Sequence, residues 1–205
     1  MIYEIRTYQI TAGSLAEVEK RFAEGYEQRK KFSPLTAFLH TELGPLNEIV
    51  HIWGYKDVAE RNAIRAEAAK GGTWPPKIGE FIRTMRSEIV VPFSFVPPLP
   101  PGPVGPYFEL RYYTLKAGRI PELQKGWEAM IPERVKMSPV VLAGPVDFGV
   151  ANGFVHIWAY KSLDQRMQIR ADAAKKGVWP PPGSADRLFT QESKILMPAS
   201  WSPLQ

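Results

Sequence analysis

The chain has 205 residues, a net charge of +5, 44% hydrophobic residues and no cysteine. This composition is typical of a soluble globular protein with its own core, and the missing cysteine excludes disulfides, thiol catalysis and thiolate metal sites. No apolar run approaches the roughly 18 residues of a membrane span, and the start MIYEIRTYQI is not a secretory signal, so we expect a cytoplasmic protein. The largest basic cluster, Arg29–Lys31, is expected to be a solvated helix end, so we expect no nucleic-acid partner.

Residues 1–96 predict the order strand, helix, strand, strand, helix, strand. The alternating segment IYEIRTYQI predicts the first strand, and Ser14 with Glu17 forms a capping-box pattern at the start of the first helix. Two strands follow around the loop LGPLN, then a helix that Asp57 and Glu60 are expected to cap, then the strand EIVVPFSF. This is the order of a ferredoxin-like unit, in which both helices lie on one face of a four-stranded antiparallel sheet.

The segment PPLPPGPVGP, residues 97–106, separates this unit from the rest of the chain. Six of its ten residues are proline, which cannot continue a helix or sit in a central strand. We therefore predict a semi-rigid linker between two domains.

Residues 107–205 repeat the first unit at an offset of 105 residues. Val50–Pro76 and Val155–Pro181 match at 17 of 27 positions without a gap, and YEIRTY recurs as FELRYY. Ser162 and Gln165 repeat the second capping pattern. A period of this length indicates a domain duplication rather than a solenoid. The predicted fold class is therefore α+β, with two ferredoxin-like halves.

Alternation along the strands sorts their side chains onto two faces. Val50, Ile52 and Gly54 share one face, and their small or branched shapes suit close packing under helices. The opposite face is amphipathic in both halves. Its members are Glu4, Arg6, Tyr8, His51, Trp53 and Tyr55 in the first half, and Glu109, Arg111, Tyr113, His156, Trp158 and Tyr160 in the second. Because so much aromatic surface should not face water, we predict that the two amphipathic faces form the interior of a closed barrel, within one chain or between two.

The motifs YEIRTYQITAG, LGPLNEIVHIWGYK and WPP resemble the NIPSNAP family, twice and over nearly the whole chain. The resemblance implies a dimeric α/β barrel fold made of ferredoxin-like halves. The same fold serves cofactor-free monooxygenases, lactone isomerases and haem-degrading enzymes, so it identifies no reaction. Animal members are linked to mitochondria, vesicle traffic and mitophagy signalling, a role that we do not extend to this chain because it shows no obvious transit peptide.

His51 and His156 are the candidate catalytic residues. A histidine beside tryptophan and tyrosine can act as a general base, because its pKa lies near neutrality. The alternative is a core histidine that bonds a backbone carbonyl or a carboxylate, and haem ligation is a weaker alternative. One histidine in each half does not assemble a metal site, so we expect no metal and no cofactor.

The pairs Glu4–Arg6 and Glu109–Arg111 are the second candidate constellation. Buried charges require pairing, so one interpretation is a structural ion pair that closes the barrel. The other interpretation is an arginine that binds an anionic or carbonyl-bearing ligand in a bidentate manner.

Further arginines lie four residues apart on the second helix of each half. They could clamp glutamates of the other half, or bind an anion at the mouth of the barrel, or lie on a solvated face. They are Arg61, Arg65, Arg166 and Arg170. Trp74 and Trp179 are expected to cap the sheet edge, with a ligand gate as the alternative.

Three functions are compatible with these patterns. The first is binding of a small aromatic or carbonyl-containing molecule in the barrel interior. The second is a cofactor-independent monooxygenase or isomerase with His51 or His156 as base and Arg6 or Arg111 as oxyanion partner. The third is a structural or protein-interaction module without a ligand. In each case we expect a homo-oligomer formed through the remaining sheet edges.

Overall fold

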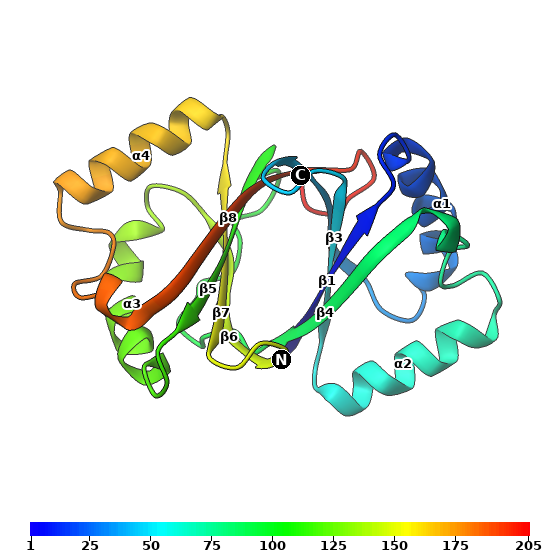
Figure 1. Ribbon diagram of the computed structural model, residues 1–205, viewed down its shortest axis with the longest axis horizontal. Helices are drawn as coiled ribbons and strands as arrows, with labels where there is room; N and C mark the ends of the chain where they lie inside the picture. Colours follow the sequence, from blue (N-terminus) through cyan, green and yellow to red (C-terminus); the bar gives the residue numbers. More distant parts are fainter.

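The computed structural model describes residues 1–205 as one closed eight-stranded barrel flanked by four helices (Figure 1). The first half comprises β1 (Ile2–Ile10), α1 (Leu15–Arg29), β2 (Leu35–Leu43), β3 (Glu48–Tyr55), α2 (Val58–Lys70) and β4 (Ile82–Val90). The second half comprises β5 (Tyr107–Leu115), α3 (Ile120–Arg134), β6 (Val140–Phe148), β7 (Gly153–Tyr160), α4 (Leu163–Lys175) and β8 (Leu188–Pro198). Short 3-10 turns, Gly79–Phe81 and Ala185–Arg187, precede β4 and β8.

Each half contributes four antiparallel strands in the ferredoxin-like order, β4-β1-β3-β2 and β8-β5-β7-β6. The halves join where β2 pairs with β8 and β4 pairs with β6. The predicted fold class is therefore confirmed, and the barrel closes within one chain. Because every strand has a neighbour on both sides, the free sheet edges through which we expected an oligomer to form are not present.

The barrel interior holds the aliphatic face of the strands. Ile5, Val50 and Ile52 of the first half share one buried cluster with Leu110 and Ile157 of the second. The prediction that the amphipathic faces form the interior is therefore wrong. An eight-stranded barrel has just enough room inside for a filling of side chains, and branched aliphatic residues fill it without leaving polar groups unsatisfied.

The amphipathic faces point outward, toward the helices. The strand register places Glu4 opposite Trp53 and Arg6 opposite His51. Trp53 packs in a separate buried cluster with Val18 of α1. In Figure 1, α1 and α2 cover one side of the barrel, and α3 and α4 cover the other. The molecule thus has an interior core and one outer core for each half.

The helix starts follow the predicted caps in two of the three tested places. In α2 the backbone N–H of Glu60 donates to Asp57 Oδ1 at 2.8 Å, and in α4 that of Gln165 donates to Ser162 Oγ at 3.0 Å. The expected cap at Ser14 is wrong, because its hydroxyl donates to the carbonyl of Thr11 at 2.6 Å and accepts no helix N–H. The preceding turn offers Ser14 a closer partner than the helix does.

The proline-rich segment 97–106 lies between β4 and β5. Its residue Val104 is buried in the interior cluster together with Leu204. The backbone N–H groups of Val104 and Gly105 both donate to the carbonyl of Gln205, at 2.6 and 2.9 Å. The linker is therefore tied to the C-terminal segment and contributes to the barrel core.

Candidate functional site

Each half encloses a cavity between its helices and the outer face of its sheet. The first cavity has a volume of about 520 Å³, and the second about 330 Å³. Five of the six predicted residues line the cavity in each half. They are Arg6, Tyr8, His51, Trp53 and Tyr55, and Arg111, Tyr113, His156, Trp158 and Tyr160. The sixth, Glu4 or Glu109, is fully buried and bonded to the arginine of its own half.

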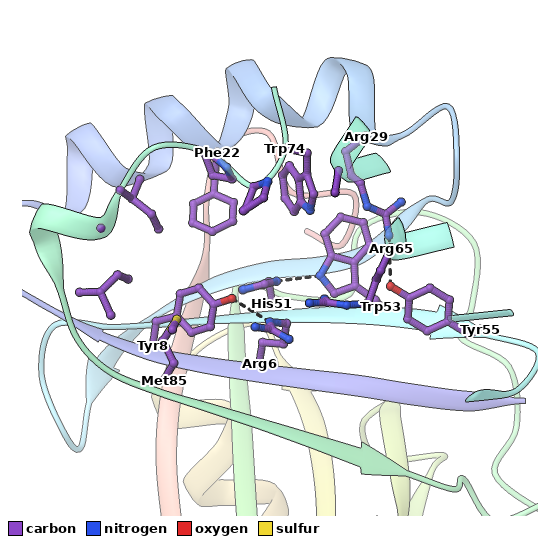
Figure 2. A pocket seen from close by; sticks show the side chains of 16 residues that line it. Arg6, Tyr8, Phe22, Arg29, His51, Trp53, Tyr55, Arg65, Trp74 and Met85 are labelled. Atoms are coloured by element: carbon purple, nitrogen blue, oxygen red, sulfur yellow. Dashed lines mark hydrogen bonds between the residues drawn. The ribbon is translucent and has the colours of Figure 1, made fainter. Parts of the chain in front are cut away.

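Figure 2 shows how the first cavity is built. Arg6, Tyr8 and His51 rise from the strands below, and Phe22 hangs from α1 above. Trp74 comes from the segment after α2 and lies beside Phe22, with ring centroids 5.7 Å apart. A Cβ atom at Gly25 of α1 would lie 3.2 Å from the carbonyl of Thr73, so glycine lets this segment approach the helix and hold Trp74 over the cavity.

The carboxylate of Glu4 lies at the centre of a cluster of arginine side chains in the first half. Its Oε1 accepts hydrogen bonds from Arg6 at 2.7 Å, from Arg61 at 2.6 Å and from Ser87 Oγ at 2.8 Å. Arg65 lies 3.6 Å from its Oε2. The alternative in which these helix arginines clamp a glutamate of the other half is wrong, because Arg61 and Arg65 reach Glu4 of their own half.

The pKa of Glu4 reflects two opposing effects. Burial alone would raise it, but the hydrogen bonds from Arg61, Arg6 and Ser87 outweigh burial and lower the pKa to about 2. Glu4 is therefore ionised near neutrality, and it links α2 to the barrel through Arg61.

The second half repeats this arrangement around Glu109. Its Oε1 accepts from Arg111 at 2.7 Å, from Arg166 at 2.6 Å and from Ser193 at 2.9 Å. Burial and the arginines act on Glu109 as they do on Glu4, and its pKa is lowered to about 2. The duplication has therefore kept the geometry of the cluster.

Arg29 is a site residue that the sequence analysis missed. Its side chain is buried, lies 4.4 Å from the ring centroid of Trp53, and donates to Ser33 Oγ at 2.8 Å and to Tyr55 Oη at 3.1 Å. None of these partners is a carboxylate, so its charge is held by an aromatic face and two hydroxyls. We expected a solvated helix end there, but Arg29 continues the buried stripe Val18, Phe22 and Gly25, which was the available signal.

Arg134 is the counterpart of Arg29 in the second half. It lies 4.0 Å from the ring centroid of Trp158, and it donates to Ser138 Oγ at 2.9 Å and to Tyr160 Oη at 3.2 Å. Burial lowers the pKa of both Arg29 and Arg134. Together with Arg6, Arg65, Arg111 and Arg170, they give each cavity three lining arginines and no lining carboxylate.

The tautomer of His51 follows from its tryptophan neighbour. Trp53 Nε1 lies 2.7 Å from His51 Nδ1, and an indole N–H can only donate, so Nδ1 accepts and Nε2 carries the proton. His51 is 2% exposed, and its Nε2 has no hydrogen-bond partner in the protein. His156 is bonded to Trp158 at 2.8 Å in the same way, and its Nε2 is likewise unpartnered. Each cavity is therefore lined by a histidine whose buried N–H has no partner in the protein.

The pKa values of both histidines favour the neutral ring. Burial is the largest cause and nearby Arg6 the second, and together they lower the pKa of His51 to about 3. Burial and Arg111 lower the pKa of His156 well below its usual value.

No three histidine, cysteine, aspartate or glutamate side chains come together in a group that could hold a metal ion. No helix is long and apolar enough to cross a membrane.

The fold is that of the dimeric α/β barrels, with both ferredoxin-like halves contained in one chain. The model of the NIPSNAP family matches residues 3–97 and 108–203. The chain therefore belongs to the NIPSNAP family and contains two NIPSNAP units in tandem.

Two NipSnap proteins are similar to the chain in sequence, and one solved structure is similar to it in fold. The human protein NipSnap homolog 3A is 25% identical over 217 residues, which cover 100% of this chain and 86% of that protein. The protein NipSnap homolog of Dictyostelium discoideum is 35% identical over 94 residues, 44% of this chain and 42% of that protein. A proposed monooxygenase of Fusobacterium nucleatum has a TM-score of 0.70 over 96% of this chain and 91% of that chain, at 12% identity. At this identity the likeness shows the fold alone.

Proposed function

We propose that each half binds a small molecule that carries an acidic or carbonyl oxygen on an aromatic or otherwise apolar body. The observation that carries this proposal is the buried Nε2–H of His51 and of His156, which has no hydrogen-bond partner in the protein and belongs to a ring that lines a cavity. A buried donor without a partner costs about 1–3 kcal/mol, so a ligand oxygen that accepts from it would be favoured by a similar amount.

The charges of the cavity support an anionic oxygen. Arg6, Arg29 and Arg65 line the first cavity, while the only carboxylate of the cluster, Glu4, already accepts three hydrogen bonds behind it. An anion near these guanidinium groups would compensate positive charge that Glu4 leaves unbalanced.

The cavity walls support a flat, apolar body for the ligand. Phe22, Trp74 and Ile78 line the first cavity together with His51, and cavities of roughly 300–1,000 Å³ are typical of small-molecule sites. We propose that the ligand places its oxygens toward His51 and Arg6 and its body against these side chains.

The test uses 1-naphthoate as a probe of this ligand class in isothermal titration calorimetry. His51→Asn and His156→Asn keep an acceptor for the neighbouring tryptophan but remove the Nε2–H. We expect the wild-type chain to bind two equivalents, and each variant to weaken one site by about tenfold or more, because a hydrogen bond to a charged group contributes about 1.5–3 kcal/mol.

His40→Asn is the matched control, because His40 pairs with Glu19 outside both cavities. It is expected to leave both sites unchanged. Absence of binding, or binding that neither cavity variant weakens, would contradict the proposal and favour the interaction-module alternative.

A cofactor-independent monooxygenase or isomerase is the second candidate. Tyr8 Oη accepts from Arg6 Nε at 2.7 Å, and its ring meets His51 edge-on at 4.9 Å between centroids. Because Nδ1 of His51 is occupied and Nε2 carries a proton, we propose that the ring donates this N–H to a carbonyl or enolate oxygen of the substrate beside Arg6, instead of acting as the base. Screening for oxygen uptake and carbonyl isomerisation would find a substrate, and turnover that survives His51→Asn with His156→Asn would contradict this assignment.

Self-association and a cytoplasmic location stay predictions of the sequence. Multi-angle light scattering of the purified chain and fractionation of its source cells would check them.

A further inference from the structure

The two cavities have the same types of polar side chain on the side of the sheet, which forms their floor, but they differ in volume. Their floors contain the same arginine, tyrosine and histidine, namely Arg6, Tyr8 and His51 in the first cavity and Arg111, Tyr113 and His156 in the second. Their volumes are nevertheless about 520 and 330 Å³. The cause must therefore lie in the walls.

A larger side chain from the covering helix makes the second cavity smaller than the first. Phe22 of α1 and Trp127 of α3 occupy equivalent places, 105 residues apart. The indole of Trp127 lies 4.6 Å from that of Trp179 between ring centroids, whereas Phe22 lies 5.7 Å from Trp74. The larger ring and its closer contact with the facing tryptophan take space from the second cavity.

Across the cavity from this helix residue, the first cavity has apolar side chains where the second has polar ones. Met85 pairs with Tyr8 across β1 and β4, and Gln191 pairs with Tyr113 across β5 and β8, so the two are equivalent. In Figure 2, Met85 lies beside Tyr8, across the first cavity from Phe22. Ile78 and Ser184 are likewise equivalent, since each precedes a 3-10 turn and lines its cavity. The second cavity thus presents an amide and a hydroxyl where the first presents apolar side chains.

We propose that the two cavities bind different members of one ligand class. Both hold the acidic oxygens on the shared floor. The first cavity takes the larger, fully apolar body, and the second takes a smaller body with a polar substituent that reaches Gln191 or Ser184. This inference rests on the proposed function, because it assumes that both floors bind an anion.

The test compares two probes in chains with one working cavity. His156→Asn leaves the first cavity, and His51→Asn leaves the second. The probes are anthracene-9-carboxylate, which is large and apolar, and 4-hydroxybenzoate, which is small and polar. We expect the ratio of their affinities to differ by about tenfold or more between the two proteins, since added or missing groups in a pocket commonly shift affinity by this much.

Exchanging the wall residues sharpens this test. Phe22→Trp in the first cavity is expected to weaken anthracene-9-carboxylate, and Trp127→Phe in the second to strengthen it. Met85→Gln and Gln191→Met should exchange the preference for 4-hydroxybenzoate, and Met85 is 61% exposed, so its replacement does not disturb a core. Equal probe ratios in the two single-cavity proteins would overturn the inference while 1-naphthoate binding still supports the proposed function. If 1-naphthoate does not bind either, both proposals are wrong.

Discussion

The barrel interior and its outer faces use the same strands in opposite ways. The interior buries aliphatic side chains such as Leu39 and Ile157 in one continuous core shared by both halves. Each outer face carries large rings, buried arginines and a cavity beneath its helices. In this barrel side chains fill the interior, so the two cavities lie between the sheet and the helices.

The largest expected effect on stability comes from the outer face. Glu4→Gln removes the charge that pairs with Arg6 and Arg61, and both guanidinium groups stay partly buried. We expect a loss of roughly 3–5 kcal/mol in the free energy of unfolding, as for other broken buried ion pairs.

Chemical denaturation measures this loss. Glu17→Gln is the matched control, because its partner Arg21 lies at the surface. A Glu4→Gln protein as stable as this control would show that the buried pair does not hold α2 on the barrel.

A somewhat smaller loss is expected from the interior. Ile157→Ala removes a fully buried side chain from the shared core, and such truncations cost about 2–5 kcal/mol. Its affinity for 1-naphthoate should stay within twofold of the wild type, because Ile157 lines neither the first nor the second cavity. A large loss of probe affinity in a folded Ile157→Ala protein would place the ligand inside the barrel instead.

Acid sensitivity should also come from the outer faces. The folded-state pKa of Glu4 and Glu109 is about 2 against a usual value of 4.5. Their contribution is therefore present above about pH 4.5 and is lost as the pH falls toward 2, by of order 3 kcal/mol for each group.

The histidines add an earlier window of acid sensitivity. The pKa of His51 is about 3 in the folded chain against a usual value of 6.5, so the unfolded chain takes up a proton first and stability falls below about pH 6.5. The double variant His51→Asn with His156→Asn should flatten the decline between pH 6.5 and 4.5. Denaturation midpoints that decline as steeply in this variant would contradict the pKa shift.

The smallest expected effect concerns the helices that cover the outer faces. Ser162 accepts the N–H of Gln165 at the start of α4, whereas Ser14 accepts no helix N–H in α1. Ser162→Ala should therefore cost about 1 kcal/mol and Ser14→Ala distinctly less. Equal losses by thermal unfolding would mean that the two serines play the same part.

The sequence was sufficient for the repeat, for the order of elements and for the side chains that share a face. Alternation separates Glu4, Arg6 and Tyr8 from Ile5 in β1, and the structure keeps these sets apart. Alternation separates two faces of a strand, but it does not indicate which face packs against the helices. The small residues beside Val50 favoured the helix side for that face, whereas in the closed barrel it lies in the interior.

The residues that form the walls of the cavities could not be predicted from the sequence patterns, for a different reason. Phe22 and Met85 belong to elements far apart in the chain, and only the fold brings them across one cavity. Arg29 was hidden because a cation at a helix end normally faces water. Its place on the buried stripe of α1 would have identified it.

The central claim is that the ligand site lies on the outer faces, at the two buried histidines. Nitrogen-15 NMR of the histidine side chains tests it directly, with His40→Asn used to assign the third ring. We predict that His51 and His156 are neutral with the proton on Nε2, and that both Nε2–H signals shift when 1-naphthoate binds. Rings that titrate near pH 6.5, or Nε2 signals that stay unchanged while the probe is bound, would contradict the account.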